Sequence, residues 1–323
     1  MSGPPAAGTR IAWEALPDHV RGAVEGWLGS PVQTAATQTG GFSPGVAARL
    51  LTVDGRRVFV KAVCGTPNPD APRFHRREIR IARALPASAP VPRLLWSFDE
   101  GATEDNRDGW VVLVFEDVEG RQPAVPWQAA ELDRVLDAMA ALAESLTPSP
   151  VPEAVADSIV RWLERHGGGW QRLAREPRPG LDEWSTRYLA ALAEIEAAAP
   201  VAAAGETLLH FDTRADNVLL TPERVYLVDW PHARLGQAWV DLVFFAPSVA
   251  MQGGPPPAEL LRRYALVAGA DPAGISAVIA AVAGFFTYQS LLPPPPGLPT
   301  LRAFQAAQGE VARLWLAERT GWR

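Results

Sequence analysis

The hydrophobic pattern of this chain changes near residue 118, and that change limits how the chain can fold. Before it, short apolar or alternating segments lie between turn residues, as β-strands do. After it, apolar residues mostly recur every three to four positions, as in helices packed on one side. Strands are expected over 32–39, 46–53, 57–63, 94–98 and 110–115, and helices over 11–30, 72–85, 127–146, 152–166 and 181–199.

The order of these segments predicts an α+β fold with two lobes. Strands joined by tight turns such as Asp54-Gly55 form antiparallel sheets, so residues 1–118 are expected to form a sheet-containing N-terminal lobe. A linker over 116–126 leads into a mainly helical C-terminal lobe, residues 119–323, which a strand pair at 218–220 and 225–228 interrupts. A chain of 323 residues is long enough for two lobes with separate cores.

Charge and cysteine content exclude several classes of protein. The formal net charge is −6 and basic residues form no run, so no nucleic-acid partner is expected. The single cysteine, Cys64, and an N-terminus without an apolar signal sequence predict a cytoplasmic protein. A monomer or a homodimer is expected. The apolar segment 275–292 is long enough to span a membrane, but its Ser, Thr, Gln and Gly residues favour a buried helix, so no membrane contact is expected.

Lys61 is the single lysine among 30 lysine and arginine residues. It ends the third expected strand, and Glu78 is the only acidic residue between Asp70 and Asp99. A compact ammonium group on a flexible stem reaches a phosphate where a planar guanidinium fits poorly. In a sequence that otherwise uses arginine, Lys61 therefore indicates a functional position, the alternative being a solvated strand end.

Three polar residues lie around the strand pair of the second lobe. Asp212 precedes the first strand, Asn217 enters it, and Asp229 follows the second, so their side chains are expected to converge at one end. Phosphoryl transfer from ATP needs a carboxylate near the acceptor hydroxyl and oxygen ligands for magnesium. Each residue alone could equally cap a turn or end a strand, but the combination favours chemistry.

The pattern His210-x-Asp212-x-x-x-x-Asn217, followed by Asp229 after a short hairpin, resembles the aminoglycoside phosphotransferase and choline kinase family, which has a protein-kinase-like fold. The resemblance implies ATP and magnesium as cofactors, Asp212 as catalytic base, Asn217 and Asp229 as metal ligands, and His210 as an orienting residue. Where protein kinases carry Asp-Phe-Gly, this chain has Asp-Trp-Pro at 229–231, which favours a fixed site over a mobile switch.

The first lobe extends the resemblance. The segment 39–45 resembles the family's nucleotide-covering loop, although a Gly-Gly turn with a proline is also typical of a plain hairpin. Lys61 matches the third-strand lysine that contacts ATP phosphates and pairs with a helix glutamate, here Glu78. The residues that the resemblance assigns to the nucleotide are Gly40, Gly41, Phe42 and Ser43 in the loop and Glu116, Asp117 and Val118 in the hinge. Asp241 matches an aspartate that braces the catalytic loop from the core.

The acceptor is expected to be a hydroxylated small molecule: an aminoglycoside or other antibiotic, an amino sugar, or an amino alcohol. The net negative charge favours an acceptor that carries an amine. Its pocket is expected between the 210–217 loop and the C-terminal helices, and Trp162, Trp170, Trp184 and Trp315 could line it or lie in the core.

Three other functions compete with a small-molecule kinase. A nucleotide-binding pseudokinase that serves as an interaction module would not need Lys61, Asp212, Asn217 and Asp229 together. A protein kinase would need an activation segment after Asp229, and none is recognisable in the sequence. A metal-dependent hydrolase using His210 and Asp212 would need a further histidine cluster, which the sequence lacks.

Overall fold

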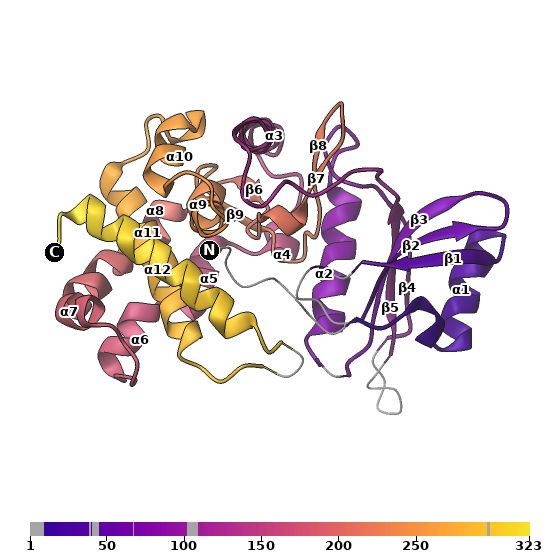
Figure 1. Ribbon diagram of the computed structural model, residues 1–323, viewed down its shortest axis with the longest axis horizontal. Coiled ribbons are helices and arrows are strands. Elements are labelled where there is room, and N and C mark those ends of the chain that lie inside the picture. The colour runs from indigo at the N-terminus through magenta and orange to yellow at the C-terminus, as the bar shows by residue number, and fades with distance from the viewer. Residues whose placement is uncertain (1–9, 39, 41–44, 67, 102–108, 296–297) are drawn as a thin grey trace.

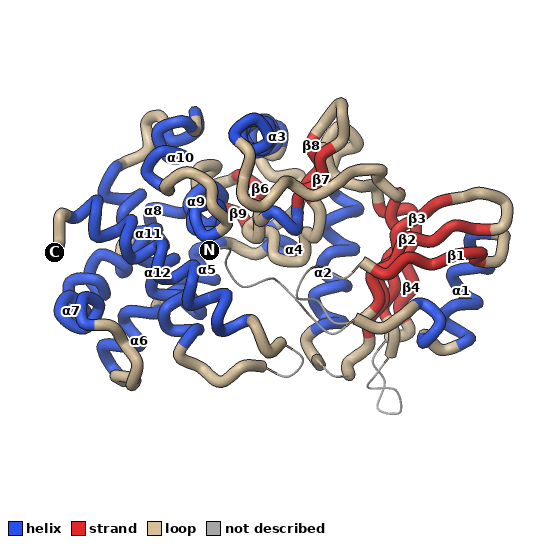
Figure 2. The backbone as a smooth tube through the Cα atoms, in the orientation of Figure 1, coloured by secondary structure: helices blue, strands red, loops and turns tan. Residues whose placement is uncertain are grey.

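The computed structural model describes residues 10–38, 40, 45–66, 68–101, 109–295 and 298–323. Its first part is a five-stranded antiparallel sheet in the order β1-β2-β3-β5-β4, seen edge-on beside the helices in Figures 1 and 2. A helix, α2 (Ala71–Ala84), connects β3 to β4 and lies between the sheet and the rest of the molecule. The strands are β1 (Val32–Thr37), β2 (Val46–Thr52), β3 (Arg57–Val63), β4 (Leu94–Asp99) and β5 (Val111–Glu116).

Alternation along the strands gives this sheet two buried faces. Val58 and Val60 of β3 pack against α1 (Asp18–Leu28), whereas Phe59 and Val63 face α2, because successive side chains of a strand point to opposite sides. A sheet covered on both faces holds β3 rigidly. The strand therefore fixes where Lys61, near its end, projects.

Helix α2 belongs to both parts of the molecule. Ile79 packs against the sheet, while Ile81, about half a turn further along the helix, joins the large core of the helical part. Glu78, the residue before Ile79, is 2% exposed. The helix thus fixes Glu78 at the boundary between sheet and helices.

The second part is mainly helical and has one large apolar core. Two small strand pairs lie on its side nearest the sheet: β6 (Thr207–Leu209) with β9 (Arg234–Gly236), and β7 (Val218–Leu220) with β8 (Val225–Leu227). The helices are α3 (Ala129–Ser145), α4 (Glu153–Ala156), α5 (Ile159–Trp162), α6 (Gly169–Arg175), α7 (Glu183–Ala197), α8 (Ala199–Ala203), α9 (Val240–Met251), α10 (Pro257–Arg263), α11 (Pro272–Ser290) and α12 (Leu301–Thr320).

The predicted α+β class, with an antiparallel sheet followed by helices, is confirmed. Two predicted helices are wrong in extent. The helix expected over 11–30 begins only at Asp18, because the extended residues Leu16 and Pro17 separate it from a 3-10 turn at Trp13–Ala15. The helix expected over 152–166 is divided at Asp157, whose φ of 57° is left-handed. The boundary at residue 118 stays a prediction.

Helix α11 corresponds to the apolar segment that raised the membrane question. It is long and apolar enough to cross a bilayer, but 61% of its apolar window is buried inside the protein. It packs against α6, α7, α8 and α12. The expectation of a buried core helix agrees with this packing.

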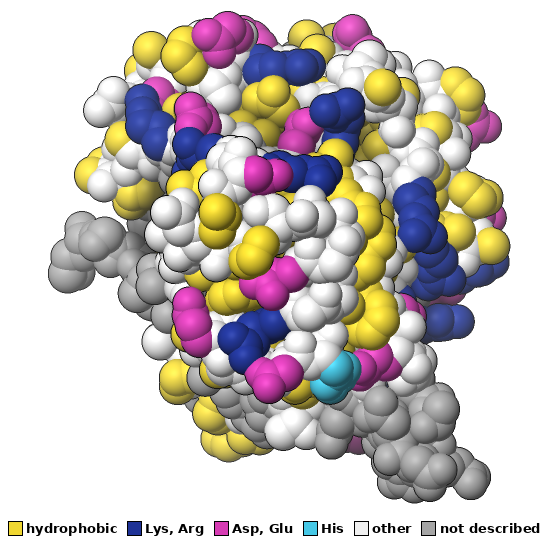
Figure 3. All heavy atoms as spheres, turned by 90° about the vertical axis from the view of Figure 1, so that its right-hand side faces the viewer, with side chains coloured by type: hydrophobic (Ala, Val, Ile, Leu, Met, Phe, Trp, Pro, Cys, Tyr) yellow, Lys and Arg dark blue, Asp and Glu magenta, His cyan; other side chains and the backbone are white. Residues whose placement is uncertain are grey.

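The outer face around α1 and β1 carries interspersed charges. Figure 3 shows acidic and basic side chains next to one another on this face, separated by apolar patches. Several basic side chains also lie next to one another along the right-hand edge of this face.

Candidate active site

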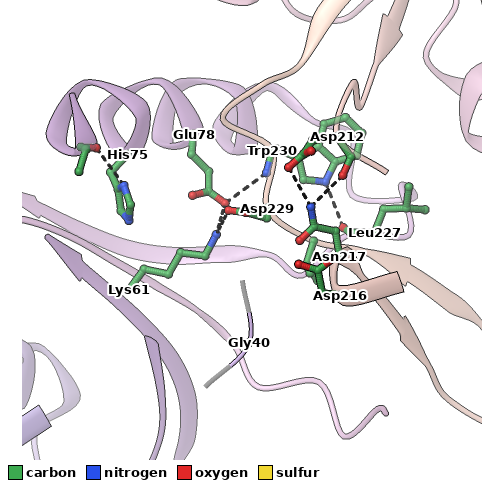
Figure 4. Close-up of polar contacts among 12 residues, drawn as sticks. Gly40, Lys61, His75, Glu78, Asp212, Asp216, Asn217, Leu227, Asp229 and Trp230 are labelled. Carbon is green, nitrogen blue, oxygen red and sulfur yellow. Dashed lines mark hydrogen bonds and ion pairs between the residues drawn. The ribbon is translucent and has the colours of Figure 1, made fainter. Parts of the chain in front are cut away.

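An ion-paired cluster joins the sheet to the helical part. The Lys61 ammonium lies 2.6 Å from Glu78 Oε1 and 2.7 Å from Asp229 Oδ1 (Figure 4). Burial alone lowers the pKa of Lys61, but the carboxylates of Asp229 and Glu78 raise it above its ordinary value, so the ammonium stays charged. Sequence analysis paired Lys61 with Glu78, and the structure adds Asp229 as a second partner.

Asp229 is held in an uncommon backbone conformation. Its φ is 72°, which is rare for a residue with a side chain and costs conformational energy. The next residue, Trp230, is buried, donates its backbone N–H to Glu78 Oε1 at 3.4 Å and donates its indole N–H to Leu227 O at 3.0 Å. These contacts anchor the Asp-Trp-Pro segment in this structure, while a site without a mobile switch stays a prediction.

The 210–217 loop brings Asp212 and Asn217 together. Asn217 Nδ2 donates to the backbone oxygen of Asp212 at 2.8 Å and to its Oδ2 at 3.1 Å. Arg214 donates to Asp212 Oδ1 at 2.6 Å and to both carboxylate oxygens of Asp216 at 2.9 and 3.0 Å. Burial raises the pKa of Asp212 to about 6, against the lowering effect of Arg214, so this carboxylate is ionised at neutral pH.

His210 and Asp241 support this loop from beneath. Asp241 accepts the backbone N–H groups of His210 and Phe211, both at 2.8 Å. The His210 ring lies 2.9 Å from Val228 O through Nε2 and 3.3 Å from the Asp212 backbone nitrogen through Nδ1, which requires a neutral ring protonated at Nε2. Burial lowers the pKa of His210, which agrees with this tautomer. Both ring nitrogens of His210 are thus engaged in hydrogen bonds within the loop region.

A cavity of about 420 Å³ lies between the sheet and the 210–230 region. Lys61, Glu78, Asn217 and Asp229 line one part of it, and the three hinge residues 116–118 line another. Among the described residues, the backbone N–H of Val118 has no hydrogen-bond partner, so it can donate a hydrogen bond to a ligand in this cavity. The side chains of Glu116 and Asp117 instead pair with arginines of the sheet region, Arg93, Arg49 and Arg57.

The predicted nucleotide-covering loop is only partly described. Gly40 lines the 420 Å³ cavity and its oxygen accepts a hydrogen bond from Arg10 at 2.7 Å. Figure 4 places Gly40 beside Lys61. Gly41, Phe42 and Ser43 lie outside the described residues, so their roles stay predictions.

A second cavity, of about 400 Å³, lies on the other side of the 210–217 loop. Asp212, Thr213 and Arg214 line it together with residues of α2, α5, α9, α11 and α12. Asp229 and His75 line both cavities, so the two meet there. One compartment can hold a phosphate donor and the other an acceptor, with Asp212 on the acceptor side.

The comparison with protein families shows to which family the chain belongs. A model of the phosphotransferase enzyme family matches residues 39–278. The chain belongs to this family. The comparison with curated protein sequences found no match.

Solved structures of this phosphotransferase fold agree with the assignment. A thermostable mutant of aminoglycoside phosphotransferase APH(4)-Ia, in a ternary complex with ADP and hygromycin B, has a TM-score of 0.58 at 16% identity and covers 91% of this chain and 98% of its own. The ADP-bound aminoglycoside phosphotransferase APH(2'')-Ib has a TM-score of 0.57 at 12% identity and covers 92% of this chain and 99% of its own. The choline kinase LicA from Streptococcus pneumoniae has a TM-score of 0.58 at 12% identity and covers 92% of this chain and 99% of its own. At these identities the likeness establishes the fold.

The donor set of this phosphotransferase fits a magnesium ion that phosphates help to hold. The amide nitrogen of Asn217 faces Asp212, so its carbonyl oxygen is free to face the first cavity. Burial raises the pKa of Asp229, but Lys61 outweighs it and holds that pKa well below its usual range, so the carboxylate is ionised. The described residues contain no group of three His, Cys, Asp or Glu side chains that could hold a metal alone. Two oxygen ligands suit magnesium only when phosphates and water complete the shell.

Sequence analysis missed Arg10 and Arg214, although both line the cavities. Arginine is so frequent in this chain that neither stood out. The four candidate tryptophans separate clearly: Trp162 lines the second cavity, Trp170 and Trp315 lie in the core, and Trp184 packs on Tyr188 and Trp322.

Proposed function

We propose that this phosphotransferase is a magnesium-dependent kinase that moves the γ-phosphoryl group of ATP to a hydroxyl of a small molecule. The observation that carries the proposal is the junction of two cavities at Asp229, with Lys61 facing the first and Asp212 the second. ADP in the related structures supports a nucleotide in the first cavity.

Each residue of the candidate site has its own role in the proposed phosphoryl transfer. Lys61 supplies positive charge for the phosphates, and Glu78 fixes its position. Asn217 and Asp229 would hold magnesium, which neutralises phosphate charge when bound. Asp212 orients the acceptor hydroxyl and accepts its proton. The acceptor oxygen forms a bond to the γ-phosphorus, the bond to the bridging oxygen breaks, and ADP leaves with that electron pair.

The related structures support a small-molecule acceptor. Hygromycin B is bound in one of them, and another is a choline kinase. An amine on the acceptor of this chain, a role in antibiotic resistance and residence in the cytoplasm stay predictions. So do the absence of nucleic-acid and membrane partners and the choice between monomer and homodimer.

A pseudokinase that serves as an interaction module is the second candidate. It would bind a nucleotide without consuming it. The Asp212 carboxylate, oriented by Arg214 and Asn217 toward the second cavity, favours catalysis because a binding module has no use for an oriented base.

The test is an ATP-consumption screen over hydroxylated metabolites and antibiotics with magnesium present, each product being identified by mass. Nucleotide binding is measured separately. Acceptor-dependent ATP consumption with a phosphorylated product is expected. ATP binding without transfer to any acceptor would favour the interaction module.

A further inference from the structure

The second cavity has a lining that phosphoryl transfer alone does not explain. Five aromatic side chains from four separate segments line it together; this aromatic wall consists of Trp162, Phe211, Phe244, Phe285 and Phe286. The Trp162 ring lies at its centre, with centroids 4.8 Å from Phe211, 5.9 Å from Phe244 and 4.9 Å from Phe285. These residues span α5, the 210–217 loop, α9 and α11.

The aromatic wall is not an ordinary piece of core. All of its members except Phe211 are only partly buried, although the neighbouring helices bury most of their other apolar residues. Apolar surface that faces a water-filled cavity gains free energy when a ligand covers it. Phe74 of α2 and Leu301 and Phe304 of α12 add further apolar surface to the cavity. A bound molecule therefore meets rings and aliphatic side chains from several directions.

The polar groups of the cavity are mostly neutral. Asn68, Thr213, Gln305 and Gln308 contribute amides and a hydroxyl. Gln308 is 3% exposed, and among the hydrogen bonds of the described residues none involves its side-chain amide. An amide that lines a cavity without a partner is suited to a neutral donor or acceptor group of a ligand.

The carboxylates of the second cavity that could bind an amine already form ion pairs with basic side chains of the protein. Asp212 and Asp229 are the carboxylates among the described residues of the lining, and each bonds a cation, Arg214 and Lys61 respectively. The Arg214 guanidinium also lies 5.9 Å from the Phe304 ring centroid. A cationic acceptor would meet paired carboxylates and a nearby positive charge.

We propose that the acceptor is an uncharged hydroxylated molecule with a largely aromatic or aliphatic body, which packs on the aromatic wall and directs one hydroxyl toward Asp212. This inference rests on the proposed kinase function and names its substrate class. It competes with the amine-bearing acceptor that net charge favoured, and desolvated contacts within the cavity decide specificity more than long-range attraction. A cavity of about 400 Å³ suits a drug-sized molecule.

The test compares a matched pair of acceptors with magnesium and ATP. One is a benzyl-substituted choline, and the other is its carbon isostere, in which a quaternary carbon replaces the nitrogen; hygromycin B serves as the polycationic comparison. The neutral isostere is expected to have the higher kcat/KM at both low and high salt. Preference for the ammonium compound would overturn the proposal and identify the aromatic wall as a cation-binding cage.

Two variants connect the preference to the cavity. Phe285→Ala is expected to raise the KM for the neutral isostere by about tenfold or more while nucleotide affinity stays unchanged. Phe285→Leu keeps apolar surface and is expected to retain most of the affinity, which separates loss of contact from loss of folding. An unchanged KM in a folded Phe285→Ala protein would contradict binding on the wall.

Equilibrium binding separates this inference from the proposed function. Titrations of both compounds into the protein with ADP and magnesium measure binding without transfer. Stronger binding of the neutral compound, weakened in Phe285→Ala, supports the inference even if no acceptor in the screen is phosphorylated, a result that would count against the kinase alone. Stronger binding of the ammonium compound would overturn the inference and leave the kinase standing.

Discussion

Lys61 Nζ lies 2.7 Å from Asp229 Oδ1, although 168 positions of sequence separate the two residues. The contact joins β3 of the sheet to the turn after β8. It places the single lysine of the chain beside a candidate metal ligand, at the point where the two cavities meet. Nucleotide charge, metal and acceptor would all converge there, so the first prediction concerns this lysine.

Lys61→Arg is expected to lower kcat/KM, with a loss of about 1 to 3 kcal/mol of transition-state stabilisation. The reason is that the planar guanidinium cannot contact both Glu78 and Asp229 as the compact ammonium does. Steady-state kinetics for ATP measure the loss. Arg76→Lys, which changes an ion pair with Asp99 on the surface, is the matched control and should leave kinetics unchanged. Equal kinetics for Lys61→Arg and wild type would place Lys61 outside the phosphate site.

Asp212→Asn is expected to lower kcat by about 10²- to 10⁴-fold while ATP affinity stays close to that of wild type, because the base acts on the acceptor. Asp216→Asn is the control for the ion pair with Arg214, because Arg214 bonds this carboxylate too, but Asp216 lines the first cavity and not the second. Nucleotide titration and turnover separate binding from chemistry. Near-wild-type turnover in Asp212→Asn would show that another group accepts the proton.

Asp229→Asn is expected to raise the magnesium concentration needed for half-maximal activity sharply or to abolish activity. The amide lacks the charge that a hard cation prefers, and it also leaves Lys61 with one carboxylate partner. A magnesium titration of both proteins measures the shift. Turnover of ATP that persists in excess chelator would refute metal dependence.

Glu196 is expected to make stability depend on pH. It is 2% exposed and accepts the backbone N–H groups of Trp170 and Gln171. Burial raises its pKa to about 8, against the lowering effect of these N–H groups. Between about pH 4.5 and about pH 8 the folded state therefore holds a proton that the unfolded state has lost, and stability falls as pH rises.

Reversible chemical denaturation across this pH range measures the effect. Glu196→Gln removes the titration and should flatten the fall, whereas the exposed neighbour change Glu194→Gln should preserve it. An identical pH slope in wild type and Glu196→Gln would show that Glu196 is ionised throughout.

Much of the fold could be predicted because local signals agreed with it. The meander of β1 to β3 has alternating apolar residues and an Asp54-Gly55 turn, and these act within a few residues. The rarity of lysine drew attention to Lys61. Pro17 carried the signal for the break before α1, but helical periodicity on both sides concealed it.

Other features depend on tertiary structure and gave no local signal. Arg214 reaches Asp212 and Asp216 through a loop in which Phe211 adopts a φ of 65°. The aromatic wall gathers side chains from residue 162 to residue 286, and periodicity cannot distinguish a ring that faces the core from one that faces a cavity. The acceptor class therefore became readable only from the assembled helices.

The most direct test of the account is transfer of labelled γ-phosphate from ATP, followed in wild type and in Asp212→Asn with magnesium and an apolar alcohol that binds the second cavity. The account predicts label in the alcohol with wild type, and bound ATP without labelled alcohol in the variant. Label transferred equally well by both proteins would contradict it.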